Sequence, residues 1–136
     1  MSPAELDQFL AAPRLCHFAT VDSRGRPTVR PTWYLWRDGA FLFTTRLRAR
    51  HFGRHVLAGS PVSISIGSED RPYRAVLASG RAEETGKDEA LLWDISSRYG
   101  EPEARRWLRR ALTESDRTTL RMVPDSIVTW DYGKGD

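Results

Sequence analysis

The sequence predicts a mainly β fold of the α+β class, a small antiparallel barrel with peripheral helices. Three observations predict it: short apolar segments with strand patterning, turn signals between them, and a single basic helical segment that interrupts the series. Because closing a sheet removes its exposed edges, several short strands of this kind favour a closed barrel. With 136 residues, of which 40% are hydrophobic and 29% charged, the chain has the size and composition of one domain over residues 1–136.

The first predicted element is a short helix that begins after Ser2. Ser2 can cap it, Pro3 suits its first position, and Glu5 completes a capping box. Pro13 lies where the helical pattern ends, and proline cannot continue a helix. We therefore expect the helix to end before that residue.

Strand patterns follow in three consecutive segments, which predict a three-stranded meander. The strands are expected at residues 15–22, 28–37 and 40–46, the last two joined by the Asp-Gly turn signal at Asp38. Residues 49–59 then have helical spacing.

After this helix, two further strands are expected at residues 61–67 and 73–84. In the first of them apolar residues alternate with serines, and in the second Gly80 predicts a bulge or a close approach of two backbones.

The second half of the chain begins with two predicted helices. Residues 87–100 form one, and Pro102 begins another that is amphipathic. Its polar face carries four arginines, which we interpret as a solvated surface: Arg105, Arg106, Arg109 and Arg110. Residues 118–124 and 126–133 supply one or two final strands.

The net charge of +3 averages two unlike halves of the chain. Between Ser23 and Ser68 the only carboxylate is that of Asp38, whereas this region holds eight arginines: Arg24, Arg26, Arg30, Arg37, Arg46, Arg48, Arg50 and Arg54. Such a local excess predicts an anionic partner for the first half. A nucleic-acid-binding barrel, with a basic strip at Arg24, Arg26, Arg48 and Arg54, is disfavoured because the second half is acid-rich.

Several classes of protein are excluded or disfavoured. No apolar run is long enough to cross a membrane, and the amino terminus lacks a signal pattern. A single cysteine, Cys16, allows no internal disulfide, so we expect a cytoplasmic protein. His51 and His55 are four residues apart but lack a third ligand, so no metal site is predicted. The sequence identifies no catalytic residue.

The segments ATVDSRGRPTVRP, WRDGAFLFTT and TWDYGKG, in this order, resemble the split-barrel flavin-binding family related to pyridoxamine 5'-phosphate oxidase. The resemblance extends from about residue 4 to Tyr132. It implies a split β-barrel and a homodimer, with FMN or the deazaflavin coenzyme F-420 bound at the subunit interface. Haem is disfavoured, since His17, His51 and His55 are the only histidines that could ligate its iron.

The resemblance also implies which residues hold the cofactor. The ring would lie along residues 30–33, and the phosphate at the end of the third strand and on the following helix. The residues that match these positions are Arg30, Pro31, Thr32, Trp33, Thr44, Thr45, Arg46 and Arg50, with Arg48 and Arg54 as alternative phosphate ligands. Trp130 and Tyr132 would close the pocket, in one arrangement from the other subunit. For any one tryptophan, a place in the core or at a dimer contact remains an equal alternative.

The function that this resemblance implies is a flavin- or deazaflavin-dependent oxidoreductase that transfers hydride to a small electrophilic substrate. The alternative is a flavin- or haem-binding protein of the same fold without turnover. A true pyridoxamine 5'-phosphate oxidase is not expected, because the sequence ends in WDYGKGD and lacks that enzyme's basic Arg-Leu-x-Pro segment. Neither nucleic acid nor a membrane is expected as a partner.

Overall fold

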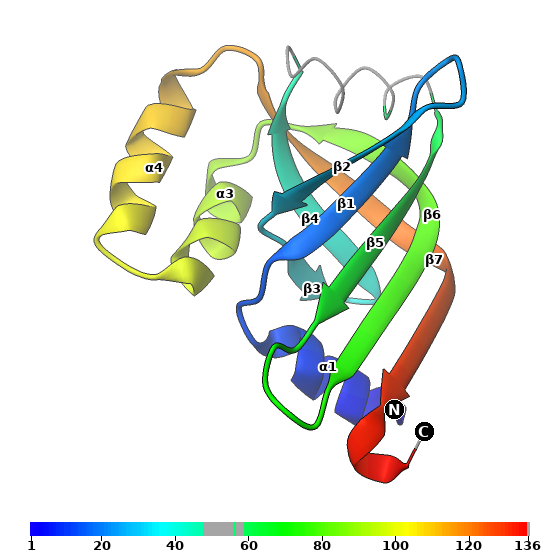
Figure 1. Ribbon diagram of the computed structural model, residues 1–136. Coiled ribbons are helices and arrows are strands. Elements are labelled where there is room, and N and C mark those ends of the chain that lie inside the picture. Colours follow the sequence, from blue (N-terminus) through cyan, green and yellow to red (C-terminus); the bar gives the residue numbers. More distant parts are fainter. Residues whose placement is uncertain (48–55, 57–58, 136) are drawn as a thin grey trace.

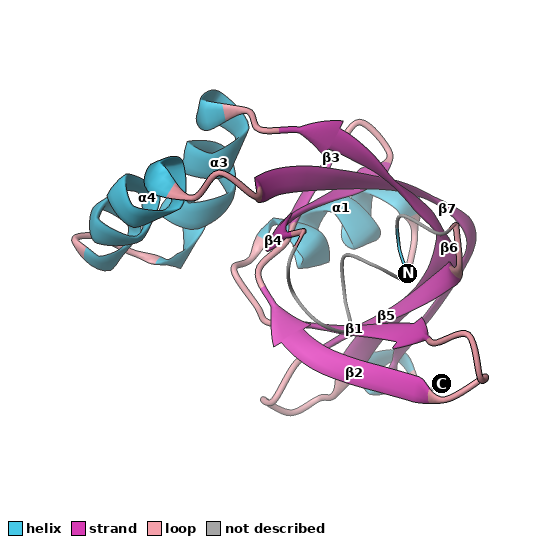
Figure 2. Ribbon diagram, turned by 90° about the horizontal axis from the view of Figure 1, so that it is seen from above, coloured by secondary structure: helices cyan, strands magenta, loops and turns pink. Residues whose placement is uncertain are grey.

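The structure, a computed structural model, describes residues 1–47, 56 and 59–135 (Figure 1). Within them, seven strands form one antiparallel sheet in the order β2-β1-β5-β6-β7-β4-β3. The strands are β1 (Cys16–Val21), β2 (Pro27–Thr32), β3 (Leu35–Arg37), β4 (Ala40–Arg46), β5 (Pro61–Gly67), β6 (Arg74–Gly86) and β7 (Arg117–Asp131). The sheet curls into a barrel (Figure 2) but is not closed, because β2 and β3 are its two edges. The expected split barrel is confirmed, and full closure is not.

The predicted second strand is divided at Trp33 and Tyr34, so the expected three-stranded meander is wrong. β2 pairs with β1, whereas β3 pairs with β4 at the opposite edge. The tyrosine side chain is fully buried, and its hydroxyl donates to the carbonyls of Leu10 and Ala12 at 3.1 Å each. Anchoring this side chain takes the backbone out of the ladder, and the chain continues in the other edge.

The local signals at the start of the chain are confirmed. α1 (Pro3–Ala11) begins after Ser2, whose hydroxyl accepts from the Glu5 amide at 3.2 Å while the Glu5 carboxylate accepts from the Ser2 amide at 3.0 Å. Asp38 and Gly39 have positive φ angles of 52° and 74°, as a two-residue hairpin turn requires. The basic helix predicted at residues 49–59 lies mostly outside the described residues, although its Val56 is buried in the core.

The two longest strands, β6 and β7, pair with each other over most of their length. Their register shifts between Ser79 and Gly80, which confirms the predicted bulge. A Cβ atom at Gly80 would lie 3.1 Å from the carbonyl oxygen of Val123, so glycine permits the close approach of the two backbones. The two segments expected near the carboxyl terminus form the single strand β7.

Between β6 and β7 the chain forms a helical pair beside the barrel (Figure 1). It consists of α3 (Glu89–Ser96), the 3-10 helix η1 (Ser97–Tyr99) and α4 (Glu103–Thr113). The Asp88 carboxylate caps α3 by accepting from the Leu91 amide at 3.1 Å. The 3-10 helix η2 (Tyr132–Lys134) follows β7. No helix in the described part of the chain combines the length and apolarity that a membrane span requires.

The core fills the interior of the barrel. Phe18 and Phe43 meet edge to face, with ring centroids 4.8 Å apart, and Ile64, Ile66 and Met122 complete the surrounding layer. Such aromatic contacts add about 0.5–1.5 kcal/mol to the free energy of burial. Apolar side chains thus pack together inside the barrel, and a pocket lies beside its helical pair.

Candidate functional site

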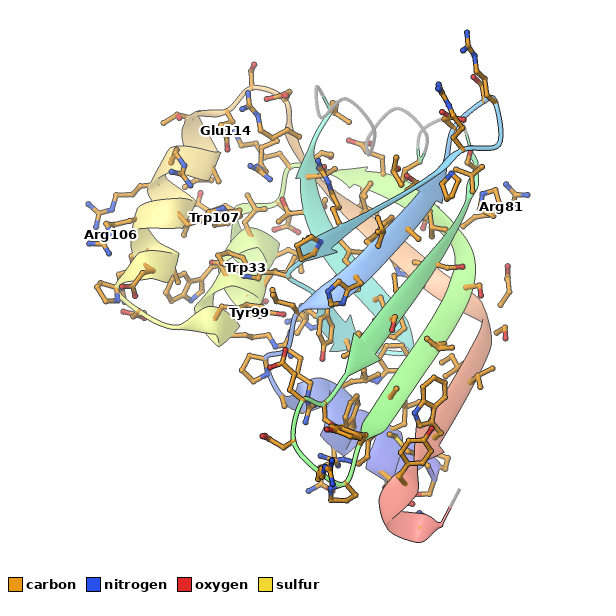
Figure 3. All side chains as sticks on the ribbon, in the orientation of Figure 1. Trp33, Arg81, Tyr99, Arg106, Trp107 and Glu114 are labelled. Carbon is orange, nitrogen blue, oxygen red and sulfur yellow. The ribbon has the colours of Figure 1, made fainter. Side chains whose placement is uncertain are left out.

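A pocket of about 320 Å³ opens on the side of the barrel that carries the helical pair. We call it the aromatic pocket. It is lined by residues from the segment before β1, the β2 and β4 strands, the segment after β2, helix α4 and the start of β7: Leu15, Pro31, Thr32, Trp33, Thr44, Trp107 and Arg117. Figure 3 shows Trp33 and Trp107 between the barrel and α4.

Trp33 forms one wall of the pocket because its neighbour Tyr34 turns into the core. Its ring stacks on that of Tyr99, with centroids 5.0 Å apart and planes inclined by 11°. The Tyr99 hydroxyl donates to the Arg14 carbonyl at 2.7 Å and accepts from the Tyr34 amide at 3.1 Å. These contacts attach the end of the helical pair to the β2–β3 connection and hold the Trp33 ring in place.

The neighbouring Arg98 strengthens the same attachment. Its guanidinium donates to the carbonyls of Leu10, Ala11 and Ala12 at 3.1, 3.2 and 3.1 Å, and also to the Tyr34 carbonyl. The last carbonyls of a helix have no partner within it, so a cation here caps α1. The β2–β3 connection is thus fixed from both sides.

Trp107 forms the second aromatic wall. Its ring centroid lies 5.2 Å from that of Trp33, with the planes at 60°. Arg106, the preceding residue, points away from the barrel (Figure 3) and pairs with Glu103 at 3.4 Å. The predicted solvated arginine face of α4 is confirmed, because all four of its arginines are exposed.

The polar end of the pocket is formed by Thr44 and Arg117. The Arg117 Nη1 donates to the Thr44 hydroxyl at 3.3 Å, and its Nη2 donates to the Glu114 carboxylate at 2.8 Å. The guanidinium also lies 5.3 Å from the centroid of the Trp107 ring. The threonine hydroxyl itself donates to the Thr118 carbonyl at 2.9 Å. A nearly buried cation therefore lies beside the aromatic walls, since only 11% of the Arg117 side chain is exposed.

Arg46 continues this polar group toward solvent. Its Nε lies 3.0 Å from both the Glu114 and the Asp116 carboxylates. The carboxylates that are scarce between Ser23 and Ser68 are thus supplied by the connection between α4 and β7. Two arginines and two carboxylates form one network, whose formal charges cancel.

The other predicted cofactor residues have different positions. Thr45 is buried but does not line the pocket, and Arg30 is exposed on the edge strand β2. Trp130 and Tyr132 lie at the far end of β7 from Arg117 (Figure 1). There Tyr132 lines a separate hollow with Arg71, Pro72 and Tyr73. Arg48, Arg50 and Arg54 lie outside the described residues, so their predicted role stays a prediction.

The structure adds three residues that sequence reasoning did not assign to the site: Leu15, Trp107 and Arg117. The apolar face of α4 placed Trp107 on the packed side of that helix but gave no sign of a pocket. For Arg117 no local pattern distinguishes it from the other arginines. The pairing of Arg46 with Arg117 between β4 and β7 brings it to the strand end predicted to bind phosphate.

Other chemistry has little support in the described part of the chain. No cluster of three histidine, cysteine or acidic side chains that could hold a metal is found there. Cys16 is fully buried, and burial raises the pKa of its thiol, so the thiolate is disfavoured. Cys16 is therefore a packing residue of the hydrophobic core.

Comparisons with known proteins identify the family and the fold of the chain. The model of the family described as pyridoxamine 5'-phosphate oxidase matches residues 2–131. Among solved structures, the chain is similar to a conserved hypothetical protein from Mycobacterium tuberculosis, with 25% identity, a TM-score of 0.80, and coverage of 98% of this chain and 87% of that one. It is also similar to an F-420 reductase, with 26% identity, a TM-score of 0.72, and coverage of 90% and 94% respectively.

A third similar structure is the heme storage protein HutZ from Vibrio cholerae. The identity is 18%, the TM-score 0.70, and the coverage 95% of this chain and 93% of that one. At this identity the likeness shows the fold alone. None of the curated proteins matches the chain in sequence.

Proposed function

Because the chain belongs to the pyridoxamine 5'-phosphate oxidase family, we propose that it holds a flavin-type cofactor, FMN or coenzyme F-420, in the aromatic pocket and acts as an oxidoreductase on a small electrophilic substrate. The observation that carries this proposal is the position of the pocket. It is lined by Pro31, Thr32 and Trp33, the segment that the family resemblance assigns to the ring, and also by Thr44, which it assigns to the phosphate.

The residues present fit a flavin-type ring. Such a ring needs a flat apolar wall and hydrogen-bond donors along its oxygen-bearing edge. Trp33 and Trp107 supply two aromatic surfaces, and Arg117 supplies charged donors beside them. A pocket that is mainly apolar, with aromatic walls and a few polar groups, is typical of cofactor sites.

When bound, either cofactor supplies the hydride chemistry. The chain's own residues then have to hold and orient the ring and keep water from it. Trp33, fixed by Tyr99 and the β2–β3 connection, is rigid enough to orient a ring. The described residues that line the pocket include no histidine or carboxylate, so positioning by them contributes more than proton transfer.

The phosphate would lie at the end of β4, where Arg46 and Thr44 meet the helix predicted at residues 49–59. Among the described residues, Arg46 contacts Asp116 and Glu114 through Nε, and its two terminal nitrogens are the donors that would face an anion. The other predicted phosphate ligands are Thr45, Arg48, Arg50 and Arg54. Because two carboxylates share Arg46, we expect further cations from this list to be needed.

The similarity to an F-420 reductase supports including the deazaflavin as a candidate beside FMN. Both cofactors share a tricyclic ring and a phosphate attached through a ribityl chain, so the same pocket would suit either. The proposal therefore keeps both.

We further propose that the protein is a homodimer with the cofactor at the subunit interface. The outer face of the sheet supports it, because one row of residues crosses five strands with little charge: Pro31, His17, Ser65, Leu77 and Val128. Leu77 and Val128 are 36% and 53% exposed, and Val29 in the adjacent row is 65% exposed. Exposed apolar side chains gathered on one face favour association.

This face also suits a contribution from a second subunit to the pocket. Pro31 belongs both to the charge-poor row and to the lining of the aromatic pocket. Trp130 pairs with Ala75 two residues along β6 from Leu77, so it lies on the same outer face. A two-fold dimer through this face would bring the partner's Trp130 toward the pocket. Trp130 of the same subunit lies at the opposite end of β7 from Arg117, which lines the pocket. Tyr132 is expected to accompany it.

The test is a titration of the purified protein with FMN and with coenzyme F-420, followed by cofactor fluorescence, together with the molar mass from light scattering. The proposal expects saturable binding of one cofactor per chain with a dissociation constant below ~100 μM, which corresponds to about 5.5 kcal/mol. It also expects the mass of a dimer. If neither cofactor binds in this range, the proposed function is wrong. If a cofactor binds, oxidation of the reduced cofactor by an added electrophile distinguishes a reductase from a binding protein without turnover.

A further inference from the structure

Arg117 is a nearly buried cation that the sequence does not single out and that the family resemblance does not assign. We propose that Arg117 donates to the oxygen-bearing edge of the ring held in the aromatic pocket, with Glu114 and Thr44 fixing the orientation of its guanidinium. This inference rests on the proposed function, since it requires a ring in this pocket.

The guanidinium of Arg117 is held on one side and open on the other. Nε and Nη2 donate to the same Glu114 oxygen at 3.3 and 2.8 Å, and Nη1 donates to the Thr44 hydroxyl at 3.3 Å. A guanidinium has five N–H groups. Among the described residues, the remaining two have no hydrogen-bond partner, and the side chain lines the pocket. They are available to a ligand acceptor.

The surroundings of Arg117 favour a ring edge over a phosphate. The Glu114 carboxylate at 2.8 Å offsets the arginine charge, so a doubly charged phosphate gains little at this position. A neutral carbonyl oxygen gains a charge-assisted hydrogen bond without being repelled. Trp107, 5.3 Å from the guanidinium, also makes this end of the pocket suitable for a flat conjugated ligand.

Arg46 is the matched counterpart in the same network. It shares Glu114 with Arg117, but 46% of its side chain is exposed against 11% for Arg117, and it does not line the pocket. Arg117, the inner arginine, would therefore contact the ring, and Arg46, the outer one, would contact the phosphate. Comparing ligands with and without a phosphate separates these two roles.

The experiment measures the affinity of Arg117→Met and Arg46→Met for riboflavin and for FMN by fluorescence titration. If coenzyme F-420 is the ligand that binds, the phosphate-free deazaflavin riboside replaces riboflavin. We expect Arg117→Met to weaken both ligands by the same factor, about tenfold, because both carry the ring edge. Arg46→Met should weaken only the phosphorylated ligand. Arg106→Met, on the exposed face of α4, is the control and should change neither.

A second readout concerns the electronic state of the ring. A reduced ring is richer in electrons along its oxygen-bearing edge, so a guanidinium there binds it more strongly than the oxidised ring. A redox titration of the bound ligand gives the dissociation constant of the oxidised ring divided by that of the reduced ring. This ratio should fall by about tenfold in Arg117→Met and stay unchanged in Arg106→Met. A residue with only a structural role would not change this ratio.

Removing Arg117 alone takes away one of the two arginines that pair with Glu114, and a variant that does not fold would not test the proposal. The double variant Arg117→Met/Glu114→Gln removes both charges, and its circular dichroism shows whether the fold is intact. We expect the same tenfold loss of riboflavin affinity in it. A loss for FMN without a loss for riboflavin would overturn the inference and make Arg117 a phosphate ligand. Unchanged affinity for both would overturn it while the proposed function stands, and a wild-type protein that binds no ring would refute both.

Discussion

The Trp33 ring lies almost parallel to the Tyr99 ring, at a centroid distance of 5.0 Å, although 66 positions separate the two residues in the chain. The first belongs to the β2–β3 connection and the second to η1. The stack therefore joins the edge of the barrel to the helical pair, and it defines the wall of the aromatic pocket. A substitution of Tyr99 should therefore change both the stability of the fold and the position of the Trp33 ring in the pocket.

We expect Tyr99→Phe and Tyr99→Leu to differ in what they lose. Tyr99→Phe keeps the stacked ring but leaves the Tyr34 amide and the Arg14 carbonyl without this partner, and should lower the free energy of unfolding by about 1–3 kcal/mol. Tyr99→Leu also loses the ring contact, which costs a further 0.5–1.5 kcal/mol, roughly. Urea unfolding measures both. Equal stability of the two variants would show that the stack contributes nothing.

Tyr34 predicts a loss of stability in alkali. Burial raises the pKa of its hydroxyl to about 12, above the ordinary value of about 10. In the unfolded chain the hydroxyl ionises from about pH 10, whereas in the folded protein it stays protonated until about pH 12. Stability due to this group is therefore complete below pH 10 and is lost as the pH rises toward 12, by roughly 3 kcal/mol at most.

Tyr34→Phe should flatten this alkaline loss, because it removes the group that titrates. At neutral pH it should cost only about 0.5–1.5 kcal/mol, since Arg98 still donates to the Leu10 and Ala12 carbonyls. Urea unfolding at pH 8, 10 and 11 follows both effects. Tyr73→Phe, which changes an exposed tyrosine, is the control. An alkaline loss of the same size in wild type and Tyr34→Phe would contradict the assignment.

Glu5 joins the two ends of the chain. Its carboxylate lies 2.6 Å from the Lys134 ammonium, and hydrogen bonding to that ammonium and to Ser2 lowers its pKa to about 2. The stabilising effect is present above the ordinary pKa of about 4.5 and is lost as the pH falls toward 2. We expect Lys134→Met to raise the Glu5 pKa toward its ordinary value, as measured by NMR titration. Lys87→Met, which removes a cation elsewhere, should leave it unchanged.

Local signals were sufficient to predict several elements of the fold. The Ser2 and Glu5 capping box, the Asp38 turn and the Gly80 bulge each depend on residues close together in the chain or on a steric demand that glycine alone meets. The division of the second strand at Tyr34 could not be predicted in this way. The alternating pattern continues through it, and the cause is a long-range anchor on α1.

The candidate site could be predicted only in part, for the same reason. The family resemblance indicated residues 30–33 and Thr44, of which the structure brings Pro31, Thr32, Trp33 and Thr44, but not Arg30, to one pocket. Arg117 reaches that pocket through the pairing of β4 with β7, across 73 positions of sequence. Arg46 is neutralised by Glu114 and Asp116 through the same strand pairing. The sequence of the basic segment alone therefore could not predict these ion pairs.

The outer face of the sheet gives a prediction about assembly. Leu77→Arg places a charge in the middle of the charge-poor row and should convert the proposed dimer to a monomer, as light scattering measures at about 10 μM protein. Burying an unpaired charge costs several kcal/mol, which exceeds what a single apolar contact provides. Ala90→Arg on the exposed side of α3 is the control and should remain dimeric. A monomeric wild-type protein would refute the proposed interface.

The most direct test of the central claim is whether a flavin-type ring binds in the aromatic pocket, against Trp33 and Trp107. Tryptophan fluorescence is recorded while FMN or coenzyme F-420 is added to the wild-type protein and to Trp107→Leu. The proposal predicts saturable quenching in the wild type and an affinity for the cofactor that is at least about tenfold weaker in Trp107→Leu, with Trp93→Leu on α3 unaffected. Saturable binding that is equally tight in all three proteins would contradict the assignment of the ring to this pocket.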